Sequence, residues 1–319
     1  MSAAPALDRT AAAVPLVTNG TGYKIAPPGF TPEQWQAFDR DGYLIIENAL
    51  TPNEVARYIA VIDEAAARHP DFTPGKTLAP WSGVAHLHPE LADLIDHARH
   101  VGYAYDLYGE LLKLHNSQFF LRPPGPSNTK WHNDGARAVP YGVYAPNVPL
   151  QFKVAYWLTD LPREKMGNLV IAPGSHKSQR FAAYTKPDDV PGQVAVCAPA
   201  GTMMFLNGNL FHTVQPNDSD VTRYNFFYTY CPSWVCEGDR FLCDAAWLAT
   251  LSREQRIIMR SYPDDPYART KPPASDFPLY LDRETGLDHD RDADPAVPLA
   301  IRKRRVAHEK ATRTTTGVE

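Results

Sequence analysis

The amino-acid sequence predicts a mainly β fold with flanking helices, in which the helices come first and buttress a core of strands. Residues 51–65 and 89–108 carry apolar side chains at helical spacing, whereas from residue 112 onward short apolar runs are broken by Gly, Pro and Asn. Helices that precede the strands, rather than alternate with them, favour a β sandwich or barrel covered on one side by helices.

Two helices begin with the same capping signature. Thr31 and Thr51 are each followed by Pro, and the third residue after each Thr is Gln34 or Glu54. In this arrangement the Thr side chain accepts a hydrogen bond from the third backbone N–H, and the longer side chain returns to the Thr backbone. The sequence therefore predicts that the two helices begin at Pro32 and Pro52.

The remaining elements follow from breakers and apolar spacing. Gly42 ends the first helix, and a short strand is expected at 43–47. A further helix is predicted over 89–108, a strand over 152–158, and a last helical region over 245–260. The apolar spacing is thus expected to change from helical to extended near residue 112 and to become helical again over 245–260.

The 319 residues are expected to form one large domain with an extension at each end. Residues 1–29 are predicted to be a tail or an arm laid over the surface. The domain covers 30–262, with its strand core at about 112–235. Residues 263–319 form a C-terminal extension that is expected to be partly disordered, and its basic run at 302–305 is interpreted as solvated.

Composition gives no support for several classes of partner. A net charge of -4 gives no argument for a nucleic-acid or anionic-membrane partner, and no run of 18 apolar residues predicts a membrane span. The four cysteines lack CxxC spacing, and the first residues lack a signal-peptide pattern. We therefore expect reduced thiols, a cytoplasmic location and a small-molecule substrate; the oligomeric state is left open.

Two histidines and one aspartate carry the strongest functional signal. His132 and Asp134 lie two residues apart, so an extended backbone places both side chains on the same side. His212, brought in from a distant strand, would complete two imidazoles and one carboxylate on one face of a metal. This ligand set leaves positions open on non-haem Fe(II), where a bidentate co-substrate and dioxygen bind.

An arginine follows the last of these ligands at a distance along the chain that could bring it back beside the metal. Arg223 lies eleven residues after His212, so it could return along the neighbouring strand. Its aromatic neighbours indicate a buried strand, where a lone guanidinium needs an anionic partner. A dicarboxylic acid such as 2-oxoglutarate would supply one, because a guanidinium grips a carboxylate through two parallel hydrogen bonds.

The segments around these residues resemble the phytanoyl-CoA dioxygenase family of Fe(II)/2-oxoglutarate oxygenases. The resemblance covers about residues 30–235 and is carried by the HxD motif, the GNLVIAPGSH segment at 167–176 and the interval from His212 to Arg223. It implies a double-stranded β-helix core, which is a cupin-like jelly-roll. It also implies Fe(II) as the metal, with 2-oxoglutarate and dioxygen as co-substrates.

The resemblance also assigns roles to single residues. The catalytic iron ligands that it implies are His132, Asp134 and His212, and Arg223 would hold the far carboxylate of 2-oxoglutarate. An aromatic residue near the co-substrate is implied at Tyr156, where a tryptophan stands in a relative, while Trp157 would face the other side of the strand. From their inward strand positions, further co-substrate contacts are expected at Gln118 and Lys130.

The substrate is less well indicated than the chemistry. The loop at 135–150 is long and rich in Pro, which is typical of a lid or a substrate wall. The predicted substrate contacts are aromatic and favour an apolar or aromatic-contacting small molecule; they are Tyr141, Tyr144, Trp81 and Trp234. The family accepts acyl thioesters, amino-acid derivatives, phosphonates and natural-product scaffolds, so a role in natural-product metabolism is one expectation.

The carboxylate at Asp134 bears on the reaction type. Related halogenases resemble this pattern but carry a small residue there, so the retained carboxylate favours hydroxylation, desaturation or a related oxidation. Two alternatives stay open: a zinc hydrolase that uses the same ligands, and a non-catalytic jelly-roll protein that binds a metabolite. The absence of an HExxH motif and the unexplained Arg223 interval argue against the hydrolase.

Overall fold

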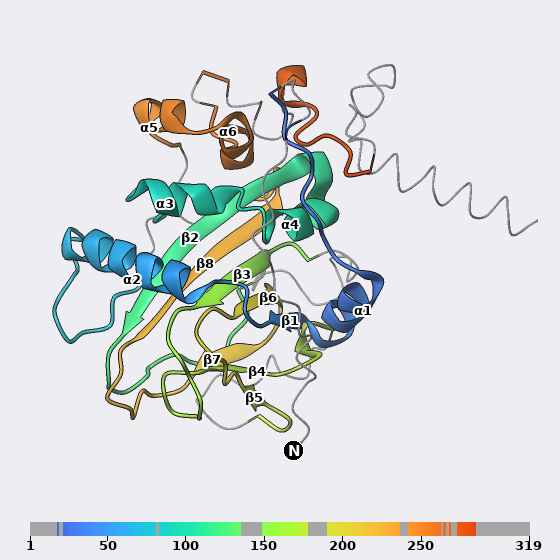
Figure 1. The fold of residues 1–319 in the computed structure, drawn as a ribbon. Helices are drawn as coiled ribbons and strands as arrows, with labels where there is room; N and C mark the ends of the chain where they lie inside the picture. The colour runs from blue at the N-terminus through green and yellow to red at the C-terminus, as the bar shows by residue number, and fades with distance from the viewer. Residues whose placement is uncertain are drawn as a thin grey trace, which may run out of the picture.

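The computed structural model describes residues 18, 22–80, 83–134, 149–177, 190–236, 242–262, 264–265, 268 and 273–284. Within these ranges the protein is built from two antiparallel sheets and a layer of helices, so the predicted mainly β fold with flanking helices is confirmed (Figure 1). No helix in the described part of the chain is long and apolar enough to cross a membrane.

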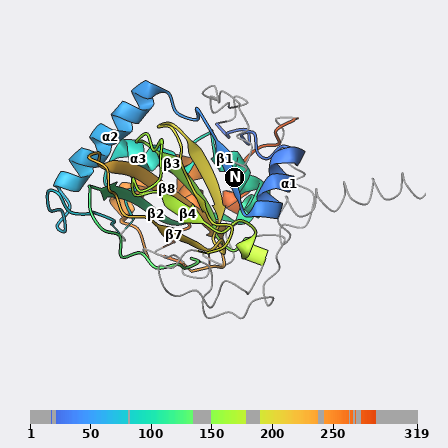
Figure 2. The ribbon, with the colours of Figure 1, turned by 90° about the horizontal axis from the view of Figure 1, so that it is seen from below.

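The larger sheet has five strands, and the smaller sheet has three. In spatial order the larger sheet contains β1 (Tyr43–Ile46), β6 (Met203–Asn207), β3 (Phe152–Trp157), β8 (Arg223–Pro232) and β2 (Leu112–Arg122). The smaller sheet contains β5 (Val194–Ala195), β4 (Leu169–Ile171) and β7 (His212–Val214). Figure 2 shows α2 and α3 on one side of the larger sheet and β4 and β7 on the other.

The helices come mostly from the N-terminal part of the chain. The α-helices are α1 (Pro32–Asp41), α2 (Pro52–Ala67), α3 (Pro89–Ala92), α4 (Val101–Tyr108), α5 (Ala245–Thr250) and α6 (Arg253–Met259). Short 3-10 turns lie at Asp93–Ile95, Gly109–Leu111, Ser175–Lys177 and Ala274–Asp276. Both predicted capping boxes are present, since Thr31 and Thr51 each exchange hydrogen bonds with the third residue of the helix that follows.

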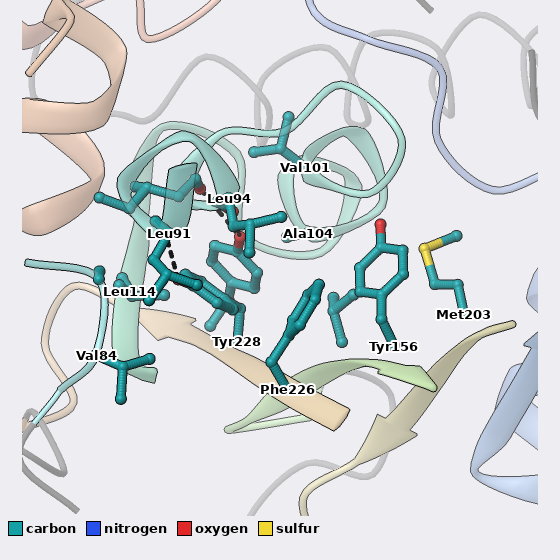
Figure 3. Packing of buried hydrophobic residues seen from close by; sticks show 14 of the residues in the cluster. Val84, Leu91, Leu94, Val101, Ala104, Leu114, Tyr156, Met203, Phe226 and Tyr228 are labelled. Atoms are coloured by element: carbon teal, nitrogen blue, oxygen red, sulfur yellow. Dashed lines mark hydrogen bonds between the residues drawn. The ribbon is translucent and has the colours of Figure 1, made fainter. Parts of the chain in front are cut away.

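The helical layer packs on one face of β3 and β8 through large side chains. Figure 3 shows Leu91 and Ala104 above the strands, with Tyr156, Phe226 and Tyr228 pointing up toward them. The Tyr228 hydroxyl donates a hydrogen bond to the Leu91 carbonyl. Because strand side chains alternate, the neighbours of these residues must face the other side, between the two sheets.

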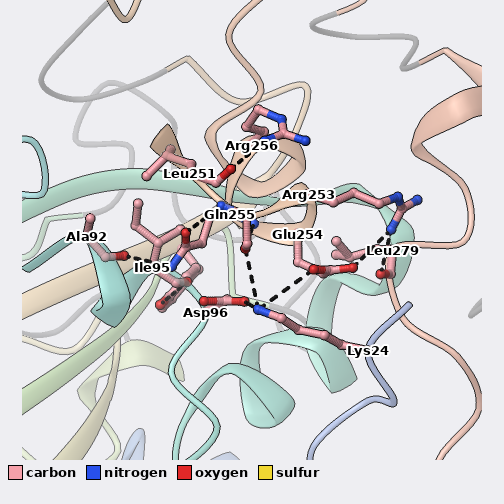
Figure 4. A network of polar contacts seen from close by, with 12 residues as sticks. Lys24, Ala92, Ile95, Asp96, Leu251, Arg253, Glu254, Gln255, Arg256 and Leu279 are labelled. Atoms are coloured by element: carbon pink, nitrogen blue, oxygen red, sulfur yellow. Dashed lines mark hydrogen bonds and ion pairs between the residues drawn. The ribbon is translucent and has the colours of Figure 1, made fainter. Parts of the chain in front are cut away.

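Two predicted helices are each interrupted at a polar residue. The helix expected over 89–108 breaks at Asp96, whose backbone leaves the helical region and whose carboxylate lies 2.5 Å from the Lys24 ammonium (Figure 4). The helical region expected over 245–260 breaks after α5, because Ser252 caps α6 through a hydrogen bond with Gln255. Apolar spacing alone did not reveal either break.

Lys24 also joins the N-terminal arm to a C-terminal segment. Its carbonyl accepts a hydrogen bond from Leu281, and Ala26 donates one to the Leu281 carbonyl, each at 3.0 Å. The Lys24 ammonium lies 3.7 Å from Glu254 of α6, in addition to its contact with Asp96. Part of each predicted extension is therefore packed against the domain.

Candidate metal centre and co-substrate pocket

Backbone pairing brings the three predicted metal ligands together. His132 and His212 form an antiparallel bridge in which each N–H donates to the other carbonyl, at 2.9 and 2.8 Å. The Asp134 N–H donates to the Gly208 carbonyl at 2.8 Å. As a result, one ligand atom from each of the three side chains lies within 4.8 Å of the others, and the group could hold a metal ion.

Both imidazoles are oriented by the chain itself. Nδ1 of His132 lies 2.7 Å from the Lys130 carbonyl, and Nδ1 of His212 lies 2.8 Å from the Leu210 carbonyl. A carbonyl only accepts, so each Nδ1 must carry a proton, which leaves each Nε2 as the ring atom that can bind a metal. Burial lowers the pKa of His212 to about 4, so this imidazole is neutral near pH 7.

The carboxylate between them is kept ionised. The His132 Nε2 lies 3.4 Å from Asp134 Oδ1, and the His212 Nε2 lies 3.5 Å from Oδ2. Burial alone would raise the pKa of Asp134, but the Lys153 ammonium that contacts Oδ2, together with the two histidines, holds it well below its usual range. Two imidazoles and one carboxylate are the ligand set that suits Fe(II).

A cavity of about 550 Å³ lies beside the triad, between the two sheets. Its walls on the larger sheet consist mostly of alternate residues: Asn116, Gln118, Phe120 and Arg122 of β2, Lys153 and Trp157 of β3, and Arg223, Asn225, Phe227 and Thr229 of β8. His115, next to an irregularity in β2, and Leu206 of β6 also line it. Most of these residues lie two apart in the chain because every second side chain of a strand points to the same face of the sheet. These side chains therefore share one space with the metal ligands.

Arg223 is the first residue of β8 and lines the same cavity as His212. The strand that carries it belongs to the larger sheet and is not the neighbour of β7 that the sequence suggested. Only 3% of the Arg223 surface is exposed. It donates a hydrogen bond to the Gly167 carbonyl, and its Nε has no hydrogen-bond partner within the described part of the chain. A buried cation with an unused donor faces the cavity, which is the arrangement expected of an anion site.

Of the predicted co-substrate contacts on the larger sheet, Gln118 lines the cavity and Tyr156 does not. Gln118 lines the cavity, and its Nε2 lies 3.5 Å from the Pro80 carbonyl. Tyr156 faces the helical layer, where its hydroxyl lies 2.9 Å from His100 Nδ1, and the β3 aromatic that lines the cavity is Trp157. This placement corrects the expectation for Tyr156, because the alternation of the strand was assigned one residue out of phase.

The other predicted contacts lie away from the cavity or outside the described residues. Lys130 is exposed and is not among the described residues that line the cavity; its carbonyl orients His132. Trp234 is 56% exposed and is also absent from that lining. The three remaining predicted substrate contacts lie outside the described residues: Trp81, Tyr141 and Tyr144.

Two cationic residues of the cavity were not found from the sequence. Lys153 interrupts the apolar run FKVAYW, and a lone lysine in a buried strand was a usable signal. Arg122 ends β2, and its position opposite Arg223 became visible only with the strand register. Neither residue belongs to a recognisable sequence motif.

Comparison with known proteins identifies the family. The family model described as phytanoyl-CoA dioxygenase (PhyH) matches residues 38–225, more than half of the chain. The chain belongs to this family. It is 31% identical over 234 residues to the ectoine dioxygenase of Nocardia farcinica, covering 62% of this chain and 76% of that protein. It is 26% identical over 232 residues to the ectoine dioxygenase of Bordetella bronchiseptica, covering 62% and 74%.

A solved structure supports the fold of this family member. HygX from Streptomyces hygroscopicus, with nickel and 2-oxoglutarate bound, superposes with a TM-score of 0.56 at 19% identity, covering 66% of this chain and 90% of that one. The predicted jelly-roll fold is thereby confirmed. The predicted class, a non-haem iron and 2-oxoglutarate-dependent oxygenase, is confirmed with it.

Proposed function

We propose that this family member couples the oxidative decarboxylation of 2-oxoglutarate to the hydroxylation or desaturation of a small polar molecule. The observation that carries the proposal is the shared cavity, into which the triad and the buried Arg223 both face. A pocket that holds both metal ligands and an anion site matches a chelating dicarboxylic acid. One end of such an acid binds the metal, and its distal carboxylate binds a cation.

His132, Asp134 and His212 would hold the iron, and the donor chemistry fits because backbone carbonyls orient both imidazoles and the pKa of Asp134 is held low. When bound, iron would activate dioxygen, which is the oxidant, and 2-oxoglutarate would supply two electrons and leave as succinate and carbon dioxide. The chain binds and orients: Arg223 fixes one end of the co-substrate, while Phe120, Phe227 and the buried Trp157 keep water from that part of the cavity.

A row of polar side chains supports a polar substrate rather than the apolar one expected from the sequence. Asn116 and Lys153 each lie opposite Thr229 in the strand register, so the three cross the large sheet side by side. Lys153 reaches Asp134, which brings this row next to the metal ligands. The Asn116 Oδ1 and the Thr229 Oγ1 have no hydrogen-bond partner within the described residues, although both atoms are buried.

The proposed function is tested by measuring succinate. Iron-loaded protein is incubated with 2-oxoglutarate and dioxygen, first alone and then with a panel of polar and apolar candidate substrates. Succinate formation that a polar compound stimulates, with loss of that compound, is the expected result. A protein that binds metabolites without consuming 2-oxoglutarate, or that hydrolyses substrates with zinc, would contradict it.

We expect Thr229→Val to weaken oxidation of the substrate found in this screen while leaving the fold intact. The side chain is 1% exposed and lines the cavity, and valine has nearly the same shape. Loss of one hydrogen bond to the substrate should cost about 1 kcal/mol, a roughly fivefold rise in KM. Thr202→Val is the matched control, because the Thr202 hydroxyl is also buried and unpartnered among the described residues but does not line the cavity. Equal KM values for the two variants would remove Thr229 from the substrate site.

A further inference from the structure

A second arginine lies beside Arg223 in the cavity. Arg122 is the direct partner of Arg223 in the pairing of β2 with β8, and both side chains line the cavity. Both also pass the same glycine: a Cβ placed on Gly167 would lie 3.7 Å from the Arg223 Cδ and 3.9 Å from the Arg122 Cδ. Gly167 has a φ of +74°, so the backbone conformation at this position favours glycine.

This pair of like charges lacks an anion. The Nε of each arginine is buried without a hydrogen-bond partner in the described part of the chain, and Arg223 bonds only to the neutral Gly167 carbonyl there. Among the described residues that line the cavity, the one carboxylate is Asp134, which already contacts Lys153 and the two histidines. Two adjacent guanidinium groups therefore face the cavity with no counter-charge from its described walls.

Such an arrangement is unfavourable until an anion arrives. Burial lowers the pKa of Arg122, and burial followed by the charge of Arg122 lowers the pKa of Arg223 well below its usual range. The lowered pKa of Arg122 reports the cost of burying a positive charge, and that of Arg223 adds the repulsion of a neighbouring positive charge. A carboxylate between them would offset this cost, since its two oxygens can accept hydrogen bonds from two guanidinium groups at once.

We infer that Arg122 is a second guanidinium of the co-substrate site and that it binds the distal carboxylate of 2-oxoglutarate together with Arg223. This inference rests on the proposed function, because that function supplies the dicarboxylic acid. It implies that the pocket selects strongly for a 2-oxo acid with a second carboxylate. It also implies that the free pocket is under electrostatic repulsion that the co-substrate relieves.

The test is calorimetric titration of the iron-loaded protein with 2-oxoglutarate in the absence of dioxygen, so that no turnover occurs. For Arg122→Gln we expect the Kd of 2-oxoglutarate to rise about 10- to 100-fold, the effect of losing one or two charge-assisted hydrogen bonds. The Kd of 2-oxobutanoate, which lacks the distal carboxylate, should not change. Arg122→Lys should lie between wild type and Arg122→Gln, and Arg163→Gln, which alters an exposed arginine outside the cavity, should behave as wild type.

Thermal unfolding separates this role from a structural one. Without ligand, Arg122→Gln should unfold at the same temperature as wild type or higher, because a repulsive neighbour of Arg223 has been removed. The rise in Tm that 2-oxoglutarate produces should be smaller in the variant, since a weaker ligand stabilises less. A residue needed only for folding would lower the Tm of the free protein and leave that rise unchanged.

The outcomes distinguish the inference from the function on which it rests. An unchanged Kd of 2-oxoglutarate in Arg122→Gln, with the expected loss in Arg223→Leu, would overturn the inference alone. Equal weakening of 2-oxoglutarate and 2-oxobutanoate would also overturn it, because the effect would not involve the distal carboxylate. If wild-type protein failed to bind 2-oxoglutarate, the proposed function would fall, and the inference with it.

Discussion

Asp134→Ala is expected to abolish substrate oxidation and to weaken iron binding by more than 100-fold. The site would keep its two imidazoles but lose its anionic ligand, and even a residue that only supports a metal ligand typically contributes 10- to 100-fold. The positive charge of Lys153, which now contacts Asp134, would then lie uncompensated beside the metal. Iron binding is measured by anaerobic titration, and turnover by succinate formation.

Two further variants make this result interpretable. Asp134→Asn keeps the shape of the side chain and removes only the charge, so it should lose iron affinity without loss of folding. Asp71→Ala removes a carboxylate that is 84% exposed and should have no effect on iron. Near-normal turnover with tightly bound iron in Asp134→Ala would refute the assignment of the triad.

The metal ligands were predictable because their spacing is set by local geometry. His-x-Asp places both side chains on the same side of an extended backbone. The eleven residues from His212 to Arg223 carry the chain from β7 in the smaller sheet to β8 in the larger sheet, and both residues line the cavity. The capping boxes at Thr31 and Thr51 were predictable for the same reason, since each involves only four consecutive residues. Interactions between residues a few positions apart can be predicted from their spacing in the sequence.

What the sequence did not reveal depends on contacts between distant segments. The break at Asp96 is stabilised by Lys24, 72 residues away, and Arg122 faces Arg223 only because β2 pairs with β8. The error at Tyr156 was of another kind. In the run FKVAYW both neighbouring aromatics are buried, one against the helices and one in the cavity, so apolar character could not say which faced the metal.

Arg223→Leu is expected to raise the KM for 2-oxoglutarate by the equivalent of about 2–5 kcal/mol, the loss typical of a buried charge pair that loses one partner. The side chain is 3% exposed, so little water is present to replace the guanidinium as a partner for the distal carboxylate. Arg223→Lys should recover only part of the loss, because an ammonium cannot reproduce the two parallel hydrogen bonds of the planar group. The measurement is succinate formation as a function of 2-oxoglutarate concentration at saturating iron.

The size of this effect relative to that of Arg122→Gln follows from the structure. Arg223 is the more deeply buried of the two and is fixed by its bond to Gly167, whereas Arg122 is half-buried. The loss in Arg223→Leu should therefore exceed the loss in Arg122→Gln, and the double variant should lose less than the two single losses combined, because both arginines bind one carboxylate. Strictly additive losses would mean that the two arginines act on separate anions, and an unchanged KM in Arg223→Leu would show that the distal carboxylate is held elsewhere.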